Sequence, residues 1–370
     1  MIQSDRQPET FIEFLSCLHR ATQHHSFTSA TTTIKSLNST PPNPSVRIDR
    51  MKYIHDIQHC TLFKQLFRPA SSTSQQHSLR FIYDLYFLSL GLRQCVLLDY
   101  MMFAKEEKLC QLLVDFSKEW NQQSLDHTTR LGLMKIEFVT LLGGNWEEMT
   151  FTYLINEKQL RTRAEQIISH ERLMPIEKRL FVNIDCLEAE NTPVPCIESS
   201  HRLNDIDAFS KQIFKEICLR VFGNCDHQSQ NPQGSTSVDL KFLKESFESN
   251  ILSFIPFDAT MMNALLLNYP IILFYGSRFN TLSDKTDFVA NHCLNHLNLQ
   301  RYSLHSSLLV DDPYILQFVI PTELYEENRS VFDSCIASWL ENVKTCVNST
   351  HERNALYLKI ESVSHDNIVL

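Results

Sequence analysis

Glycine is scarce in this chain, and the scarcity limits the ligand-binding folds that the chain can adopt. Only 7 of the 370 residues are glycine, whereas average usage would give roughly 26. Glycine lets the backbone approach a phosphate closely and adopt positive φ angles, because it has no Cβ atom. No two glycines stand at G-x-G spacing, and none fits G-x-x-x-x-G-K-[ST] or G-x-S-x-G. The common dinucleotide, phosphate-loop and nucleophile-elbow sites are therefore excluded, and side chains would have to hold any ligand.

The charged residues and the cysteines restrict the partners and the compartment. The net charge is −9, and no run of five or more Lys and Arg occurs, so we expect no binding to nucleic acid. The 11 cysteines are scattered without a C-x-x-C pair, and the sequence MIQSDRQPET has no signal-peptide character. The most apolar windows, 85–104 and 261–276, are too polar or too short for a membrane span. We therefore expect a soluble protein of the cytoplasm or nucleus with reduced cysteines.

The apolar spacing divides the chain into four regions. Residues 1–25 are expected to hold an amphipathic helix, because Phe11, Phe14, Leu15 and Leu18 follow helical spacing. Residues 26–48 are rich in Ser, Thr and Pro and are expected to be a flexible segment. Residues 50–346 are expected to form a single globular α/β domain, and 347–370 a C-terminal tail of uncertain order.

Two strand pairs stand out within the expected domain. Near 134–155, β-rich runs flank Gly143 and Gly144, which supply the positive φ angles of a hairpin turn. Near 302–320, two strand-like runs are expected to form an antiparallel pair. Gly91 and Gly223 are expected to end helices. Because strands and helices alternate up to about residue 275, the fold class is α/β (or α+β), with a mixed β-sheet and helices packed on it.

Several histidines and cysteines have spacings that metal sites use. The pairs His55/His59 and His292/His296 lie one helical turn apart, but neither contains the Glu of H-E-x-x-H. Among 15 histidines such pairs arise by chance. The set Cys218, Cys225 and His227 has no standard zinc spacing, and Cys196 with Arg202 matches C-x₅-R no better than chance. We therefore expect no metal and no cofactor.

Several apolar runs end in aspartate, at Asp99, Asp185, Asp258, Asp311 and Asp312. In open α/β sheets, the carboxyl ends of strands converge on a ligand crevice, where clustered carboxylates can bind Mg²⁺ or act as acid and base. Aspartate is also preferred at helix N-termini and in turns, and that interpretation is the simpler one. Asp99 and Asp185 are the candidate catalytic residues if the enzyme interpretation holds.

Three segments resemble an uncharacterised animal open-reading-frame family that is described only as a domain of unknown function. They are LGLRQCVLLDYMMF at 90–103, LLLNYPIILFYG at 265–276, and YILQFVIPTELYEENRSVFDSCIASWLENV at 314–343. The resemblance begins near residue 75 and implies neither an activity nor catalytic residues.

Two hypotheses about function therefore stand side by side. In the first, the protein is not an enzyme and acts through surface contacts with an unknown protein partner. In the second, it is a small-molecule or metal-dependent enzyme whose site is built from Asp99 and Asp185. The second hypothesis predicts that the two carboxylates lie close together in a pocket and that at least one has a raised pKa.

Overall fold

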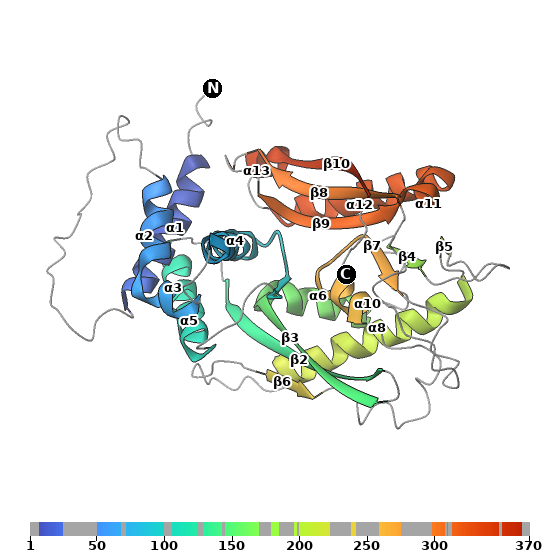
Figure 1. The fold of residues 1–370 in the computed structure, drawn as a ribbon, viewed down its shortest axis with the longest axis horizontal. Helices are drawn as coiled ribbons and strands as arrows, with labels where there is room; N and C mark the ends of the chain where they lie inside the picture. The colour runs from blue at the N-terminus through green and yellow to red at the C-terminus, as the bar shows by residue number, and fades with distance from the viewer. Residues whose placement is uncertain are drawn as a thin grey trace, which may run out of the picture. The chain divides into compact units, whose positions relative to one another are not determined.

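The computed structural model divides the chain into two compact units, and its elements are labelled in Figure 1. The first unit is Met1–Ser89 with Asp99–Gly132, and the second is Leu90–Leu98 with Leu133–Leu370. The residues that the structure describes are 7–24, 50–67, 72–99, 106–123, 129–142, 145–169, 179–184, 196–197, 200–222, 238–241, 259–274, 298–307, 309, 313–347 and 350–364. The expected flexible segment, 26–48, lies outside them.

The first unit is helical and has an aromatic core. Its helices are α1 (Gln7–His24), α2 (Arg50–His59), α3 (Thr61–Leu66), α4 (Ser72–Ser89) and α5 (Glu106–Gln123). The amphipathic spacing near the N-terminus lies on α1, where Phe11 and Phe14 are buried. Phe14 meets Tyr86 of α4 and Phe116 of α5 edge-on, with ring centroids 5.1 and 5.3 Å away. Helix α1 therefore contributes core side chains to this unit.

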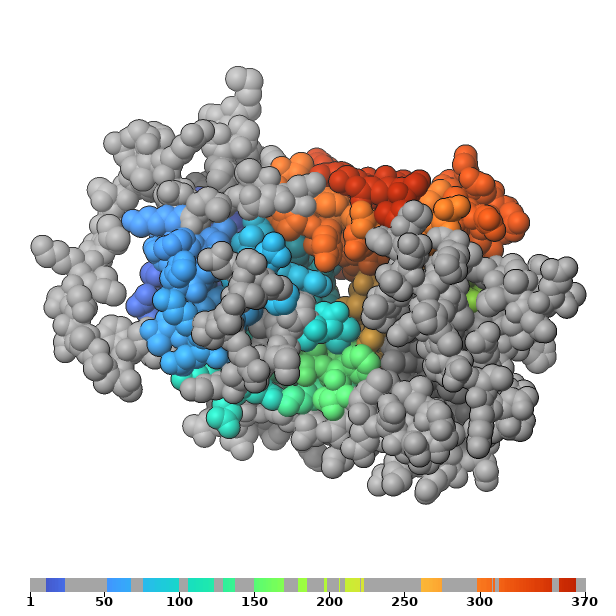
Figure 2. Space-filling view, in the orientation of Figure 1, coloured from blue at the N-terminus to red at the C-terminus, as the bar shows by residue number. Residues whose placement is uncertain are grey.

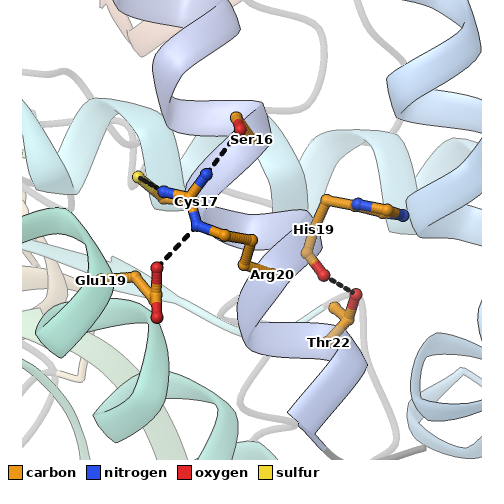
Figure 3. Close-up of polar contacts among 6 residues, drawn as sticks. All are labelled: Ser16, Cys17, His19, Arg20, Thr22 and Glu119. Carbon is orange, nitrogen blue, oxygen red and sulfur yellow. Dashed lines mark hydrogen bonds and ion pairs between the residues drawn. The ribbon is translucent and has the colours of Figure 1, made fainter. Parts of the chain in front are cut away.

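In the first unit, polar contacts join α1 to α5 and mark the break between α2 and α3. Arg20 of α1 donates from Nε to Oε2 of Glu119 on α5 at 2.7 Å, and from Nη1 to Oγ of Ser16 at 2.8 Å (Figure 3). Cys60 separates α2 from α3, because its extended backbone interrupts the helix and its Sγ accepts a hydrogen bond from the Phe63 amide at 3.4 Å. A cap of this kind satisfies an amide that has no partner within the helix.

The second unit contains three small sheets. The first has the order β1-β3-β2-β6, and the second β5-β4-β7. Their strands are β1 (Cys95–Leu97), β2 (Leu131–Leu142), β3 (Asn145–Asn156), β4 (Leu180–Asn183), β5 (Cys196–Ile197), β6 (Val238–Lys241) and β7 (Ile271–Phe274). The first sheet is mixed, since β1 pairs antiparallel with β3 and β2 pairs parallel with β6. The hairpin predicted near 134–155 corresponds to the neighbours β2 and β3, although Gly143 and Gly144 lie outside the described residues.

One hydrophobic core joins the first two sheets to three helices. The helices are α6 (Glu157–Ser169), α8 (Ser200–Val221) and α10 (Ala259–Leu266). The core draws buried side chains from the three helices and from β1, β2, β3, β4 and β7, among them Tyr153 of β3, Phe181 of β4, Phe214 of α8 and Leu265 of α10. Within it, the Tyr153 hydroxyl donates to Oδ1 of Asn263, so the phenol keeps a hydrogen bond despite its burial.

The third sheet lies in the C-terminal part of the chain. Its strands have the order β10-β8-β9 and are β8 (Asn298–Ser306), β9 (Tyr314–Pro321) and β10 (Leu356–Ser364); the helices here are α11 (Thr322–Glu327), α12 (Arg329–Thr345) and α13 (Thr350–Ala355). Strands β8 and β9 confirm the antiparallel pair predicted near 302–320. Tyr302 and Phe318 stack at 5.2 Å, and Trp339 of α12 meets Phe318 edge-on at 5.7 Å. Helix α12 therefore covers this apolar face of the sheet.

The fold class is confirmed, and the expected single domain with a C-terminal tail of uncertain order stays a prediction. Within residues 347–370, strand β10 pairs with β8 over nine residues and lies on the surface in Figure 2. A strand at a sheet edge exposes part of its length, so its apolar signal is weak. The chain also leaves the helical unit at Leu90, adds β1 to the second unit, and returns at Asp99. A linear sequence gives no sign of such an excursion.

No helix in the described part of the chain is both long and apolar enough to cross a bilayer.

Candidate functional site

The aspartates that follow strands are placed only in part. Asp99 is exposed, two residues after β1, whereas Asp185, Asp258, Asp311 and Asp312 lie outside the described residues. The strands before Asp99 and Asp185 are β1 and β4, which belong to different sheets. Their carboxyl ends therefore do not share the edge of one parallel sheet, which was the geometric reason for pairing these two carboxylates. A site built from Asp99 and Asp185 stays a prediction.

The histidine and cysteine candidates are also placed in part. His55 and His59 both lie on α2, with ring centroids 4.1 Å apart. Among the described residues there is no group of three or more His, Cys, Asp and Glu that could hold a metal ion. Cys218 is buried in α8, and Cys196 lies in β5. The remaining members of the predicted sets lie outside the described residues: Cys225, His227, His292 and His296.

Arg163 stands among the apolar side chains of helix α6. Leu160, Ala164 and Ile167 are the buried residues of this helix. Arg163 has the i+3 spacing from Leu160 and precedes Ile167 by four, so it lies on the same side of the helix. Its side chain is half-buried. A guanidinium group in this position is held against the core, whereas arginine on an amphipathic helix usually faces solvent.

Arg179 stands immediately before strand β4 and is still more buried. It is only 3% exposed, and its Nη2 donates to Oδ1 of Asn268 at 2.5 Å. Strand β4 pairs parallel with β7, so Leu180 lies beside Ile271, and the Leu180 amide donates to the Pro270 carbonyl at 3.1 Å. The strand pairing thus brings Arg179 to the short connection between α10 and β7.

That connection has a backbone shape which only a few residue types adopt readily. Asn268 has a positive φ of 64°. The amide of Tyr269 donates to the Ala264 carbonyl at 3.0 Å, and the amide of Asn268 to the Leu265 carbonyl at 3.3 Å. This is the Schellman pattern that ends helices, with asparagine at the left-handed position where glycine is most common. Asparagine therefore ends helix α10 and also presents its side-chain oxygen to Arg179.

Helix α12 also makes hydrogen bonds to the connection between α10 and β7. Trp339 donates from Nε1 to the Asn268 carbonyl at 2.9 Å, and the Cys335 thiol contacts the Pro270 carbonyl at 3.4 Å. Cys335 and Trp339 are four residues apart, so they share the buried face of α12. Asn268, which orients Arg179, therefore takes part in hydrogen bonds through both its backbone carbonyl and its side chain.

The two guanidinium groups influence each other. Burial lowers the pKa of Arg163 well below its usual range, and the positive charge of Arg179 lowers it further. Burial lowers the pKa of Arg179 to about 10. A guanidinium with that pKa stays protonated at neutral pH. The site therefore places two like charges within electrostatic range of each other in a region from which much of the water is excluded.

Two buried arginines are chemically suited to binding an anion. Each guanidinium presents a planar fork of N–H donors that matches the oxygens of carboxylate or phosphate. Electrostatic attraction is stronger where the surroundings have a low dielectric constant. The Nε and Nη2 atoms of Arg163 are buried although the residue as a whole is half-buried, and Nη2 of Arg179 is held by Asn268.

A glycine is required next to this site. Gly91 has a φ of +75°, and a Cβ atom placed there would come within 2.7 Å of Nε2 of Gln159. Gln159 lies four residues before Arg163 on α6, so it occupies the neighbouring turn. The expected role of Gly91 as a residue that follows a helix is met, since α4 ends at Ser89. The close approach of Gln159 is a second reason for glycine at this position.

Sequence reasoning missed both arginines, although one of them left a signal. In the run Leu160 to Ile167, a charged residue occupies an inner position of an otherwise amphipathic helix. That conflict between local pattern and charge marks a place where function or a buried network is expected. No comparable signal marked Arg179, because its burial depends on the pairing of β4 with β7.

Comparison with known proteins bears on family membership alone. No curated protein and no solved structure matched this chain. Residues 63–370 match the model of a domain of unknown function (DUF4504). That segment includes every described element from α4 onwards and both arginines of the site. Since the match covers most of the sequence, the chain belongs to this family, the domain of unknown function DUF4504.

Proposed function

We propose that the protein binds a small molecule through a phosphate group held by Arg163 and Arg179. The observation that carries the proposal is the placement of two mutually interacting guanidinium groups against the core of the second unit. Each guanidinium carries a planar fork of N–H donors that fits the oxygens of a phosphate group. A phosphate monoester carries a charge between −1.5 and −2 at neutral pH, which is close to the charge of the pair.

The chain's composition supports a ligand held in this way. With only 7 glycines, the protein cannot form the common glycine-rich backbone cradles for phosphate. Arginine side chains provide the alternative, because a guanidinium can bind two phosphate oxygens at once. Arg179 supplies a fixed contact, since Asn268 holds its Nη2 atom. Arg163 would contact the ligand from the helix α6 side.

Thermal unfolding in the presence of phosphate compounds tests the proposal. Inorganic phosphate, pyrophosphate and a sugar phosphate would be compared at low millimolar concentration and constant ionic strength. A ligand at about 100 times its Kd stabilises the native state by about 2.7 kcal/mol. For a domain of this size, that corresponds to a rise in Tm of several degrees. The expected result is a saturable rise with at least one phosphate compound.

Three variants make the test specific. Arg163→Gln should abolish the rise, and Arg179→Gln should do the same if it folds, as judged by circular dichroism. Arg161→Gln is the matched control, because Arg161 is exposed on the same helix and its loss changes the net charge equally. A rise of the same size in wild type and Arg163→Gln would mean that phosphate acts elsewhere, and the proposal would fail. The absence of any rise in wild type would also contradict it.

The two earlier hypotheses stay predictions beside this proposal. Large apolar side chains are exposed in the C-terminal part of the chain, where a protein partner could contact them: Tyr314, Val331, Tyr357 and Ile360. They favour surface interaction as a second candidate function. An interaction through this surface and phosphate binding by Arg163 and Arg179 do not exclude each other.

A further inference from the structure

Helix α2 carries two histidines on the same exposed turn. His55 and His59 are four residues apart, and their ring centroids are 4.1 Å from each other. The side chain of His55 is 68% exposed, and His59 is exposed as well. The core side of this helix is formed by Ile54 and Ile57, which are 2% and 0% exposed. The imidazoles therefore take no part in packing, and their proximity has no structural role in the core.

Asp56 gives the pair a further property. Oδ1 of Asp56 lies 3.7 Å from Nδ1 of His55. That distance is too long for a hydrogen bond and makes the contact an electrostatic one. Attraction to the carboxylate favours a proton on Nδ1, which leaves Nε2 of His55 as the lone-pair donor for a metal ion.

We propose that His55 and His59 bind a divalent transition-metal ion such as Zn²⁺, Ni²⁺ or Cu²⁺. Two imidazoles at i and i+4 on one helix face can coordinate the same ion, as in helical zinc sites. Imidazole suits these metals, and the affinity order favours Cu²⁺. Among the described residues no group of three His, Cys, Asp and Glu could hold a metal ion, so the protein would supply two ligands here. Water or a ligand from a partner would fill the other positions, so the bound ion would be exchangeable rather than structural.

This inference is independent of the phosphate site. His55 and His59 lie in the first unit, whereas Arg163 and Arg179 lie in the second. Neither histidine contributes to the phosphate-binding proposal. A negative result for one site therefore leaves the other unaffected.

Calorimetric titration of the full chain with Zn²⁺ or Ni²⁺ alone tests the inference. Wild-type protein should bind one ion at this site. His55→Gln and His59→Gln should each weaken that binding by at least about tenfold, since even the loss of an outer-sphere partner has an effect of this size. Glutamine is compatible with a helix and both positions are exposed, so the variants should fold. The Cu²⁺ electron paramagnetic resonance spectrum should show two nitrogen donors in wild type and fewer in His59→Gln.

The other histidine pair of the chain provides the matched control. His292→Gln/His296→Gln removes two histidines at the same spacing and should leave the binding intact. Equal affinity in wild type, His55→Gln and His59→Gln would overturn the inference. Loss of the site in the control variant would also overturn it, because the ion would then be bound at His292 and His296. The inference would also be overturned if the wild-type protein bound none of the three metals.

Discussion

Oδ1 of Asn268 accepts a hydrogen bond from Nη2 of Arg179, and the carbonyl of the same asparagine accepts one from Nε1 of Trp339. Asn268 thus connects helix α12 to the deeply buried arginine of the proposed phosphate site. It can do so because its backbone has the left-handed conformation that ends helix α10. Asn268 therefore ends helix α10, holds the buried Arg179, and contacts helix α12.

Two substitutions at Asn268 separate its roles. Asn268→Gly keeps the left-handed backbone but removes the hydrogen bond to a charged group, which contributes about 2 kcal/mol to stability. Asn268→Ala removes the hydrogen bond and adds backbone strain, which costs roughly 1 kcal/mol more. Urea unfolding should therefore rank stability as wild type, then glycine, then alanine. Equal stability of the glycine and alanine variants would show that the conformation at this position is not left-handed in solution.

The ion pair between Arg20 and Glu119 should contribute little to stability. The side chains are 40% and 21% exposed, so solvent screens their attraction. A double-mutant cycle with Arg20→Gln and Glu119→Gln should give a coupling energy of about 0.5 kcal/mol. Because salt screens exposed charges, the coupling should decrease in 1 M NaCl. A coupling of several kcal/mol that does not change with salt would mean that the pair is buried.

Strand β10 can be tested at two positions on the same face of the strand. Leu356 is 7% exposed, whereas Ile360 is 57% exposed. Leu356→Lys should destabilise the protein by about 3 kcal/mol or more, because a buried leucine is lost and a charge has to be accommodated. Ile360→Lys should change stability by no more than about 0.5 kcal/mol. If both substitutions had the same small effect, residues 356–364 would not be part of the folded sheet.

Much of the secondary structure could be predicted from the sequence, because it depends on local spacing. The apolar spacing of Phe11 and Phe14 predicted α1, and the two strand-like runs near 302–320 predicted β8 and β9. The grouping of strands into three sheets could not be predicted in this way. Which strands pair depends on contacts between residues far apart in sequence, such as Leu180 with Ile271. Short apolar strands carry no information about their partners.

The candidate site could be predicted less well than the secondary structure, because it also depends on contacts between residues far apart in sequence. Aspartates at strand ends were chosen because the strands were expected to share one sheet, but β1 and β4 belong to different sheets. Arg163 was detectable as a charge within an apolar helix face. Arg179 was not, because its environment is formed by Asn268, which lies 89 residues away in sequence.

Cys17 should make the protein less stable at alkaline pH. Its side chain is fully buried, and burial is the main reason why its pKa is raised from 9.0 to about 11. Below pH 9 the thiol is protonated in both the folded and the unfolded chain, and its contribution is fully present. Between pH 9 and 11 the unfolded chain releases the proton first, so stability falls by up to about 3 kcal/mol in total. Comparing urea unfolding of wild type and Cys17→Ala across this window isolates the effect. If their difference in stability did not change with pH, the thiol would not be buried.

The close contact at Gly91 should be measurable in the same way. Gly91→Ala places a Cβ at a φ of +75° and 2.7 Å from Nε2 of Gln159. The backbone strain costs roughly 1 kcal/mol, and displacement of the glutamine adds to it. Gly91→Ala/Gln159→Ala removes the obstacle but leaves the strain, so the second substitution should be less harmful in the Gly91→Ala background than in wild type. Additive effects in urea unfolding would contradict the contact. A non-additive result would show that a Cβ at position 91 and the Gln159 side chain compete for the same space beside helix α6, which carries Arg163.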